Sequence, residues 1–92
     1  MKKVIKIKIF GKTTCDACKA TKEKFNFFLN HWGLSSRAEI LYFDLDTVDG
    51  LSQGAYLDAL EFPTTILEKD GRELARWKKT VPTSQEFRQF FE

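Results

Sequence analysis

The chain has 92 residues, which is enough for one compact domain but not for two independent cores. Hydrophobic residues make up 42% of it, and 15 basic and 13 acidic side chains nearly cancel, leaving a formal net charge of +2. The near-neutral charge, without a basic block, argues against nucleic acid as the main partner, and no apolar run approaches the ~20 residues that a membrane-spanning helix needs.

The N-terminal segment predicts a β-strand. Residues 5–10 alternate three isoleucines with Lys6, Lys8 and Phe10, which is the period of two that strands show. The two lysines indicate that one face of this strand is only partly covered, and Gly11 ends it. The start of the chain superficially resembles a secretory leader. However, Lys6 and Lys8 interrupt its apolar part and no small-residue cleavage site follows, so we expect a cytoplasmic protein.

The two cysteines of the chain come next, at positions 15 and 18, where a helix is predicted to begin. Apolar residues recur at helical spacing from Asp16 to Trp32, and Gly33 is a natural C-cap. The first turn of a helix has unpaired N–H groups and the positive end of the helix dipole, so a thiolate there is favoured over a thiol. Such placement can lower the pKa of a cysteine from ~8.5 to roughly 3.5–7.5. We therefore predict that Cys15 is a nucleophile and that Cys18, one turn further in, resolves a mixed disulfide.

The rest of the chain predicts two more helices and three more strands. Residues 38–45 are apolar enough to form a strand buried on both faces, and residues 46–60 form a short helix weakened by Gly50 and Gly54. Residues 64–68 and 73–78 form a β-hairpin around an Asp-Gly turn, and residues 83–86 form a capping box that starts a last helix. The expected order is βαβαββα, in a single α/β domain over residues 1–92.

A Cys-x-x-Cys at the first strand-to-helix turn, with Pro63 just before the third strand, resembles the thioredoxin/glutaredoxin superfamily over essentially the whole chain. The resemblance implies a thioredoxin-like fold, in which a four-stranded mixed sheet is flanked by three helices. It also implies that Pro63 is cis and faces the nucleophile. The backbone beside Pro63 would then pair with an extended substrate segment as an added strand.

The resemblance divides between two groups. Lys12-Thr13-Thr14-Cys15 is similar to the glutaredoxin active-site entry, where the lysine helps to hold the thiolate and a glutathione carboxylate. Phe62-Pro63-Thr64, the Asp-Gly hairpin and the final helix are more similar to thioredoxin. The resemblance and the position of each residue give a candidate substrate-binding set of Lys12, Thr14, Phe62, Pro63, Thr64 and Thr80. Asp16 and Lys19 are expected to tune the pKa of Cys15 in opposite directions.

Four positions depart from the two patterns. Asp16-Ala17 stands between the cysteines, where thioredoxins have Gly-Pro and glutaredoxins Pro-Tyr. Ile9 occupies the place of the buried thioredoxin aspartate, and Thr14 that of a tryptophan. Residues 78–82 lack the Gly-Gly-acid element with which glutaredoxins grip glutathione. These departures leave the electron donor open between a thioredoxin reductase-like enzyme and glutathione. We expect a monomer with no bound cofactor or metal, which reduces a protein or peptide disulfide.

Three other functions remain as alternatives. A Thr-Cys-x-x-Cys loop after a strand is also similar to the site of copper chaperones, which carry Cu(I) on two thiols. Those domains run βαββαβ and usually have methionine two residues before the first cysteine, where this chain has Thr13. The others are a glutathione-dependent glutaredoxin and an inactive thioredoxin-like binding module. Thiol titration with and without Cu(I), followed by a disulfide-reduction assay, separates these functions.

Overall fold

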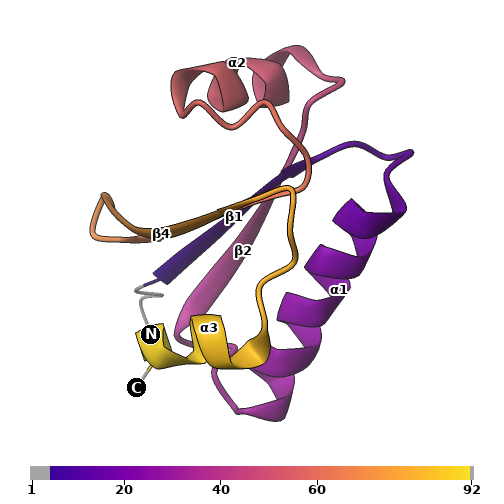
Figure 1. The fold of residues 1–92 in the computed structure, drawn as a ribbon. Helices are drawn as coiled ribbons and strands as arrows, with labels where there is room; N and C mark the ends of the chain where they lie inside the picture. Colours follow the sequence, from indigo (N-terminus) through magenta and orange to yellow (C-terminus); the bar gives the residue numbers. More distant parts are fainter. Residues whose placement is uncertain (1–4, 92) are drawn as a thin grey trace.

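The computed structural model describes residues 5–91. Residues 1–4, which belong to the segment compared with a secretory leader, and residue 92, the end of the predicted domain, lie outside this range. The expected element order is confirmed (Figure 1). In chain order the elements are β1 (Ile5–Gly11), α1 (Asp16–His31), β2 (Ala38–Asp44), α2 (Val48–Tyr56), β3 (Thr64–Lys69), β4 (Arg72–Lys78), α3 (Ser84–Arg88) and the 3₁₀ turn η1 (Gln89–Phe91).

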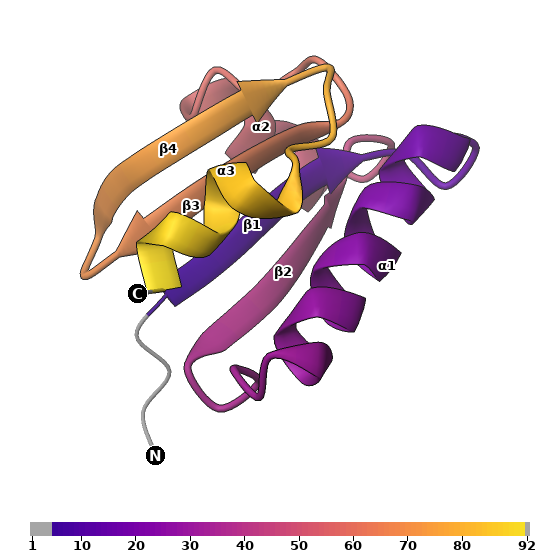
Figure 2. The ribbon, with the colours of Figure 1, turned by 60° about the horizontal axis from the view of Figure 1, so that its bottom comes forward.

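The four strands form one mixed sheet in the order β2-β1-β3-β4. β1 runs parallel to β2 and antiparallel to β3, and β3 is antiparallel to β4. The helix α1 makes the connection that a parallel pair requires. Figure 2 shows α1 and α3 on one face of the sheet and α2 behind the other. The expected four-stranded mixed sheet with three helices is therefore confirmed.

The main core lies between the sheet and the two helices α1 and α3. The three isoleucines of β1 all point to this side, where aromatic side chains of the two helices pack together. The rings of Phe25 and Phe87 have centroids 4.5 Å apart, and Trp32 lies 5.6 Å from Phe87. Each fully buried side chain of this size stabilises the fold by roughly 1.5–3 kcal/mol, so these contacts hold the short α3 against α1.

The opposite face is only partly covered, as the lysines of β1 predict. Near α2 a smaller core forms around Phe10, Leu45, Ala59 and Ile66. Further along this face Lys8 pairs with Glu68 on the neighbouring strand, with Nζ and Oε2 2.9 Å apart.

Two sequence predictions need correction. β2 is not buried on both faces: only Ala38 is buried, because β2 lies at the edge of the sheet. The second helix ends at Tyr56 rather than at residue 60. Its glycines also do more than weaken it, since both are buried, and a Cβ on Gly50 would overlap the backbone carbonyl of Asp44. Gly50 therefore lets α2 approach the end of β2.

The last helical segment is a short α-helix followed by the 3₁₀ turn η1. The predicted capping box at its start is present, with the side chains of Thr83 and Glu86 each accepting from the other's backbone N–H. Within residues 5–91, no helix has the length and apolar character to cross a membrane.

Candidate active site

The two cysteines lie at the start of α1, as the sequence predicts, and are joined by a disulfide. Cys15 is the N-cap residue, and its Sγ accepts a hydrogen bond of 3.1 Å from the backbone N–H of Cys18. The Cα atoms of the pair are 5.2 Å apart. The positive end of the helix dipole and a backbone N–H thus both point at the sulfur of Cys15, which favours negative charge there.

The two sulfur-bearing residues differ in exposure. Cys15 is half-buried, whereas Cys18 is completely buried, with 0% of its surface exposed. A substrate can therefore reach Cys15 and not Cys18. This asymmetry suits a pair in which one thiol attacks and the other acts only after the first has reacted.

Gly11 and Tyr42 lie beside the buried Cys18. A Cβ on Gly11 would lie 2.7 Å from Cys18 Sγ and 2.6 Å from the Tyr42 hydroxyl oxygen. That hydroxyl donates a long hydrogen bond of 3.3 Å to the carbonyl of Lys12. Burial, and secondarily the nearby carboxylate of Asp44, raise the pKa of Tyr42.

The sequence pattern does not single out Tyr42, because it stands in the apolar run 40–43, which predicts ordinary strand core. Its position in β2 does hold a signal. Tyr42 pairs with Ile9 of β1, so the two side chains share the face that α1 covers. Alternation along two parallel strands, in the correct register, would have placed it beneath the cysteines.

Lys12 connects the cysteine loop to the segment around Pro63. Its Nζ lies 3.4 Å from Asp46 Oδ1 and 5.1 Å from the centroid of the Phe62 ring. Asp46 stands at the start of the helix predicted over residues 46–60, a pattern that does not reveal its ion pair with Lys12. Lys12 is thus partly neutralised in the described structure, rather than free to hold an external carboxylate.

The Phe62–Pro63 peptide bond is cis, in agreement with the resemblance. Pro63 is buried, and its carbonyl accepts from the N–H of Lys79 at 2.8 Å. Thr64 is also buried, with its hydroxyl donating to the Glu61 carbonyl at 2.6 Å. In contrast, Phe62 is 41% exposed, and within residues 5–91 its backbone N–H and carbonyl make no backbone hydrogen bond.

The other candidate residues lie at the surface around this centre. Thr14, Asp16 and Lys19 are exposed, and Thr80 is exposed at the end of the β4 loop. The residue with left-handed backbone in that loop is Lys79, with φ of 60°, and not Thr80. The structure therefore brings Lys12, Phe62 and the cysteine loop together and leaves Thr80 beside them as an exposed loop residue.

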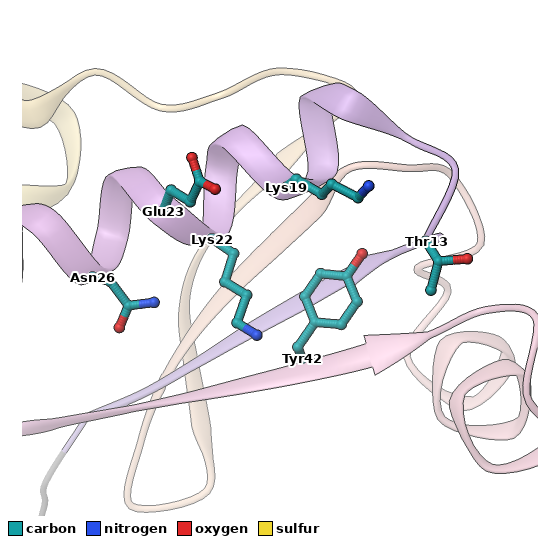
Figure 3. Close-up of a pocket in the computed structure, with 6 residues that line it drawn as sticks. All are labelled: Thr13, Lys19, Lys22, Glu23, Asn26 and Tyr42. Carbon is teal, nitrogen blue, oxygen red and sulfur yellow. The ribbon is translucent and has the colours of Figure 1, made fainter.

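A pocket of about 310 Å³ opens between α1 and β2. Figure 3 shows the Tyr42 ring on its floor, with the hydroxyl directed toward the loop that carries Thr13. The side chains that line the pocket are those of Thr13, Lys19, Lys22, Glu23, Asn26 and Tyr42.

Within the described residues no group of three or more His, Cys, Asp or Glu side chains is placed to hold a metal ion. The element order, which ends on a helix, also differs from the βαββαβ order of the copper carriers considered above. The two thiols of residues 15 and 18 are bonded to each other in this structure.

Comparison of the sequence with protein-family models and with curated proteins gives no match. Comparison of the fold with solved structures gives many. Thioredoxin-2 of the malaria parasite is 24% identical and superposes with a TM-score of 0.79, over 99% of this chain and 84% of that one. The thioredoxin of Fasciola hepatica is 19% identical, with a TM-score of 0.71 over 97% and 79%. The germline-specific thioredoxin Deadhead of Drosophila melanogaster is 19% identical, with a TM-score of 0.72 over 98% and 80%.

These similarities establish that the chain has a thioredoxin-like fold, which confirms the resemblance in fold inferred from the sequence. The Cys15–Cys18 pair is present within that fold, at the first turn of α1.

Proposed function

We propose that this protein is a thiol-disulfide oxidoreductase that reduces disulfides of proteins or peptides. One observation carries the proposal: a Cys-x-x-Cys disulfide at a helix start, with one cysteine half-exposed and the other buried. The thioredoxin-like fold supports it, although fold alone does not assign an activity.

The reaction follows from this asymmetry. In the reduced protein the Cys15 thiolate attacks one sulfur of the substrate disulfide, and the other substrate sulfur leaves as a thiolate. Cys18, as a thiolate, then attacks Cys15 Sγ, and the second substrate sulfur leaves. Two electrons have passed to the substrate, and the protein carries the Cys15–Cys18 disulfide seen in the structure. An external donor then reduces it again.

The substrate segment is positioned by the loop around Pro63. The Pro63 carbonyl is already bonded to Lys79, so an added strand would use the backbone N–H and carbonyl of Phe62. The exposed Phe62 ring offers apolar contact beside these groups. Thr14 and Thr80 are exposed and would contribute to the same surface, while Thr64 fixes the loop through its bond to Glu61.

Glutathione is a weaker candidate than a protein. Lys12, the residue that would attract its carboxylate, is paired with Asp46, and an exposed ion pair contributes only ~0–1 kcal/mol. Residues 78–82 contain no Gly-Gly-acid element. Hydrogen bonds to charged groups are worth about 1.5–3 kcal/mol each, so losing that element outweighs keeping one lysine. A protein segment pairs with the Phe62 backbone and does not depend on it.

We propose a reductase resembling thioredoxin reductase as the electron donor, with no bound cofactor. A reducing role fits a compartment that keeps the pair reduced, such as the cytoplasm. We propose that the protein acts as a monomer.

The roles of the two cysteines are tested by trapping. The Cys18→Ser variant should accumulate a mixed disulfide with a protein substrate, because the resolving thiol is missing. The matched Cys15→Ser variant should accumulate none. Non-reducing electrophoresis and mass spectrometry of the adduct measure both. The reverse pattern would overturn the assignment of nucleophile and resolving thiol.

The donor is tested by supplying either thioredoxin reductase with NADPH or glutathione with its reductase, and following NADPH consumption with a protein disulfide. Turnover by the first system supports the proposal. Robust turnover of a small glutathione mixed disulfide by the second, with negligible reduction of protein disulfides, would instead make the protein a glutaredoxin. Tight binding of Cu(I) without either activity would favour the metal carrier.

A further inference from the structure

The resolving step requires Cys18 to become a thiolate, and the two cysteines alone do not explain how that thiolate is stabilised. Cys18 must lose its proton before it can attack, yet it is fully buried, and burial opposes formation of a thiolate. Ile9 stands where the thioredoxin pattern has a buried aspartate, and an isoleucine can neither accept nor donate a proton.

A polar group does face the buried sulfur across Gly11. Cys18 Sγ and the Tyr42 hydroxyl oxygen lie 2.7 and 2.6 Å from the point that a Cβ on Gly11 would occupy. The oxygen and the sulfur are therefore separated by at most the sum of these distances, with no side chain on Gly11 to keep them apart. The present bond of the hydroxyl, to the Lys12 carbonyl, is long at 3.3 Å and easily exchanged.

We propose that in the reduced protein the Tyr42 hydroxyl donates a hydrogen bond to the Cys18 thiolate, which stabilises that thiolate and speeds resolution of the mixed disulfide. This inference rests on the proposed function. The contact forms by rotation of the Cys18 side chain and of the phenolic O–H once the S–S bond is open. A hydrogen bond to the charged form of a group lowers the pKa of an acid.

The surroundings of Tyr42 make it a donor rather than a base. Burial and the carboxylate of Asp44, on the same strand, raise its pKa, so the phenol keeps its proton at neutral pH. From α1, Lys22 Nζ lies 5.4 Å from the ring centroid, and Lys19 and Glu23 line the same pocket. From the cysteine loop, the backbone carbonyl of Lys12 accepts the hydrogen bond of the Tyr42 hydroxyl. The side-chain ammonium of Lys12 is paired with Asp46.

A pocket lies beside Tyr42, the residue whose hydroxyl is proposed to contact Cys18. Its volume of about 310 Å³ accommodates several waters next to the ring. In the proposed step the proton of Cys18 passes to solvent water. The Cys18 thiolate then forms the bond to Cys15 Sγ, the bond from Cys15 to the substrate sulfur breaks, and the electron pair leaves with the substrate as a thiolate. No further oxidant or reductant is needed.

The first test measures the pKa of Cys18 directly. In a Cys15→Ser background Cys18 is the single thiol, and the ¹³Cβ resonance of labelled cysteine reports its ionisation. Adding Tyr42→Phe, which keeps the ring, should raise the Cys18 pKa by about one unit, the scale of one lost hydrogen bond to a charged group. The matched control is Tyr56→Phe, which removes the hydroxyl of the other tyrosine, 85% exposed on α2. An unchanged pKa, or an equal rise in the control, would overturn the proposal.

The second test measures resolution without a protein substrate. Reduced protein reacts with a chromogenic aromatic disulfide in two phases, of which the second is attack by Cys18 on the mixed disulfide at Cys15. Near neutral pH Tyr42→Phe should slow the second phase about tenfold and leave the first unchanged. Equal second phases in wild type and variant would refute the role. If protein disulfides are not reduced while this effect is present, the proposed function fails and the Tyr42 contact stands.

A third variant tests whether a stronger hydrogen-bond donor at residue 42 lowers the pKa of Cys18. In the Tyr56→Phe background, incorporation of 3-fluorotyrosine modifies Tyr42 alone, because the chain has two tyrosines. The more acidic phenol is a stronger donor, so the pKa of Cys18 should fall. A rise, or no shift, counts against the hydrogen bond.

Discussion

The fit between β1 and the first turn of α1 is tested by Gly11→Ala. Gly11 is buried at the end of β1, and its missing side chain is replaced by atoms of Cys18 and Tyr42. An added methyl carbon would stand 2.6–2.7 Å from the Tyr42 hydroxyl oxygen and from both side-chain atoms of Cys18. Real carbon contacts are ~3.5–4.0 Å, so these groups must move by about 1 Å.

The expected cost follows from which groups can yield. The phenol can give way by releasing its long bond to Lys12, but Cys18 is held in the first turn of α1 and by the disulfide. Overpacking a fixed site typically costs about 1–3 kcal/mol. Replacing glycine within a strand returns roughly 0.5–1 kcal/mol through the unfolded chain. With the middle of each range, the net loss is about 1 kcal/mol, or a fall in Tm of roughly 4–8 °C for a domain of this size.

Urea unfolding of the oxidised protein, followed by circular dichroism, measures this loss. Gly33→Ala is the control, because a Cβ there meets nothing within 4 Å while φ is +69°. It should lower stability through the backbone alone and leave thiol exchange unchanged. Gly11→Ala should affect both stability and the resolving step. A Gly11→Ala protein that unfolds at the wild-type urea concentration, with normal resolution, would show that the helix start is not tightly fitted to β1.

Three further predictions concern charges. Asp16→Asn removes a carboxylate beside the nucleophile, so the pKa of Cys15 should fall and the redox potential should become less negative. Titration of the reduced protein measures the pKa, and equilibration with a redox buffer measures the potential. No change in either would mean that the carboxylate points into solvent and does not influence Cys15. Asp46→Asn frees Lys12 from its ion pair and should raise glutathione-coupled turnover a few-fold, whereas the double variant with Lys12→Met should not. Glu86 caps α3, and hydrogen bonds from the Thr83 backbone and side chain hold its pKa below the ordinary value. Its stabilising effect is therefore present above about pH 4.3 and lost as the pH falls through the lowered pKa, so wild type and Glu86→Gln should differ in urea midpoint at pH 7 and converge near pH 3.

Most of the fold could be predicted because the local signals agree with one another. The alternating isoleucines of β1, the helical spacing after Asp16 and the capping box at residues 83–86 each act within one turn or one strand pair. The burial of β2 was predicted wrongly because it depends on the place of that strand in the sheet. An apolar run such as residues 40–43 predicts burial, but whether a strand is central or at the edge depends on the order of strands in the sheet.

In the candidate site too, some residues are predictable from local patterns and others depend on the tertiary fold. The cysteine pair and Pro63 are recognisable because their spacing and order in the chain are sufficient signals. The ion pair of Lys12 with Asp46, and the approach of Tyr42 to Cys18, join residues some 24–34 positions apart. Such contacts depend on strand register and on a glycine that leaves room, and neither is visible in a local pattern.

The cap of α1 has a consequence for how easily the protein changes between its two redox states. In the disulfide form the N–H of Cys18 donates to Cys15 Sγ, and Cys15 is the N-cap residue of α1, so this bond does not depend on a third group. Opening the disulfide therefore removes no hydrogen-bond partner from the helix start, and the same N–H is already directed at the atom that acquires negative charge. We therefore expect the reorganisation that accompanies electron transfer to involve the side chains of Cys15, Cys18 and Tyr42, while the backbone of the first turn serves both the oxidised and the reduced protein.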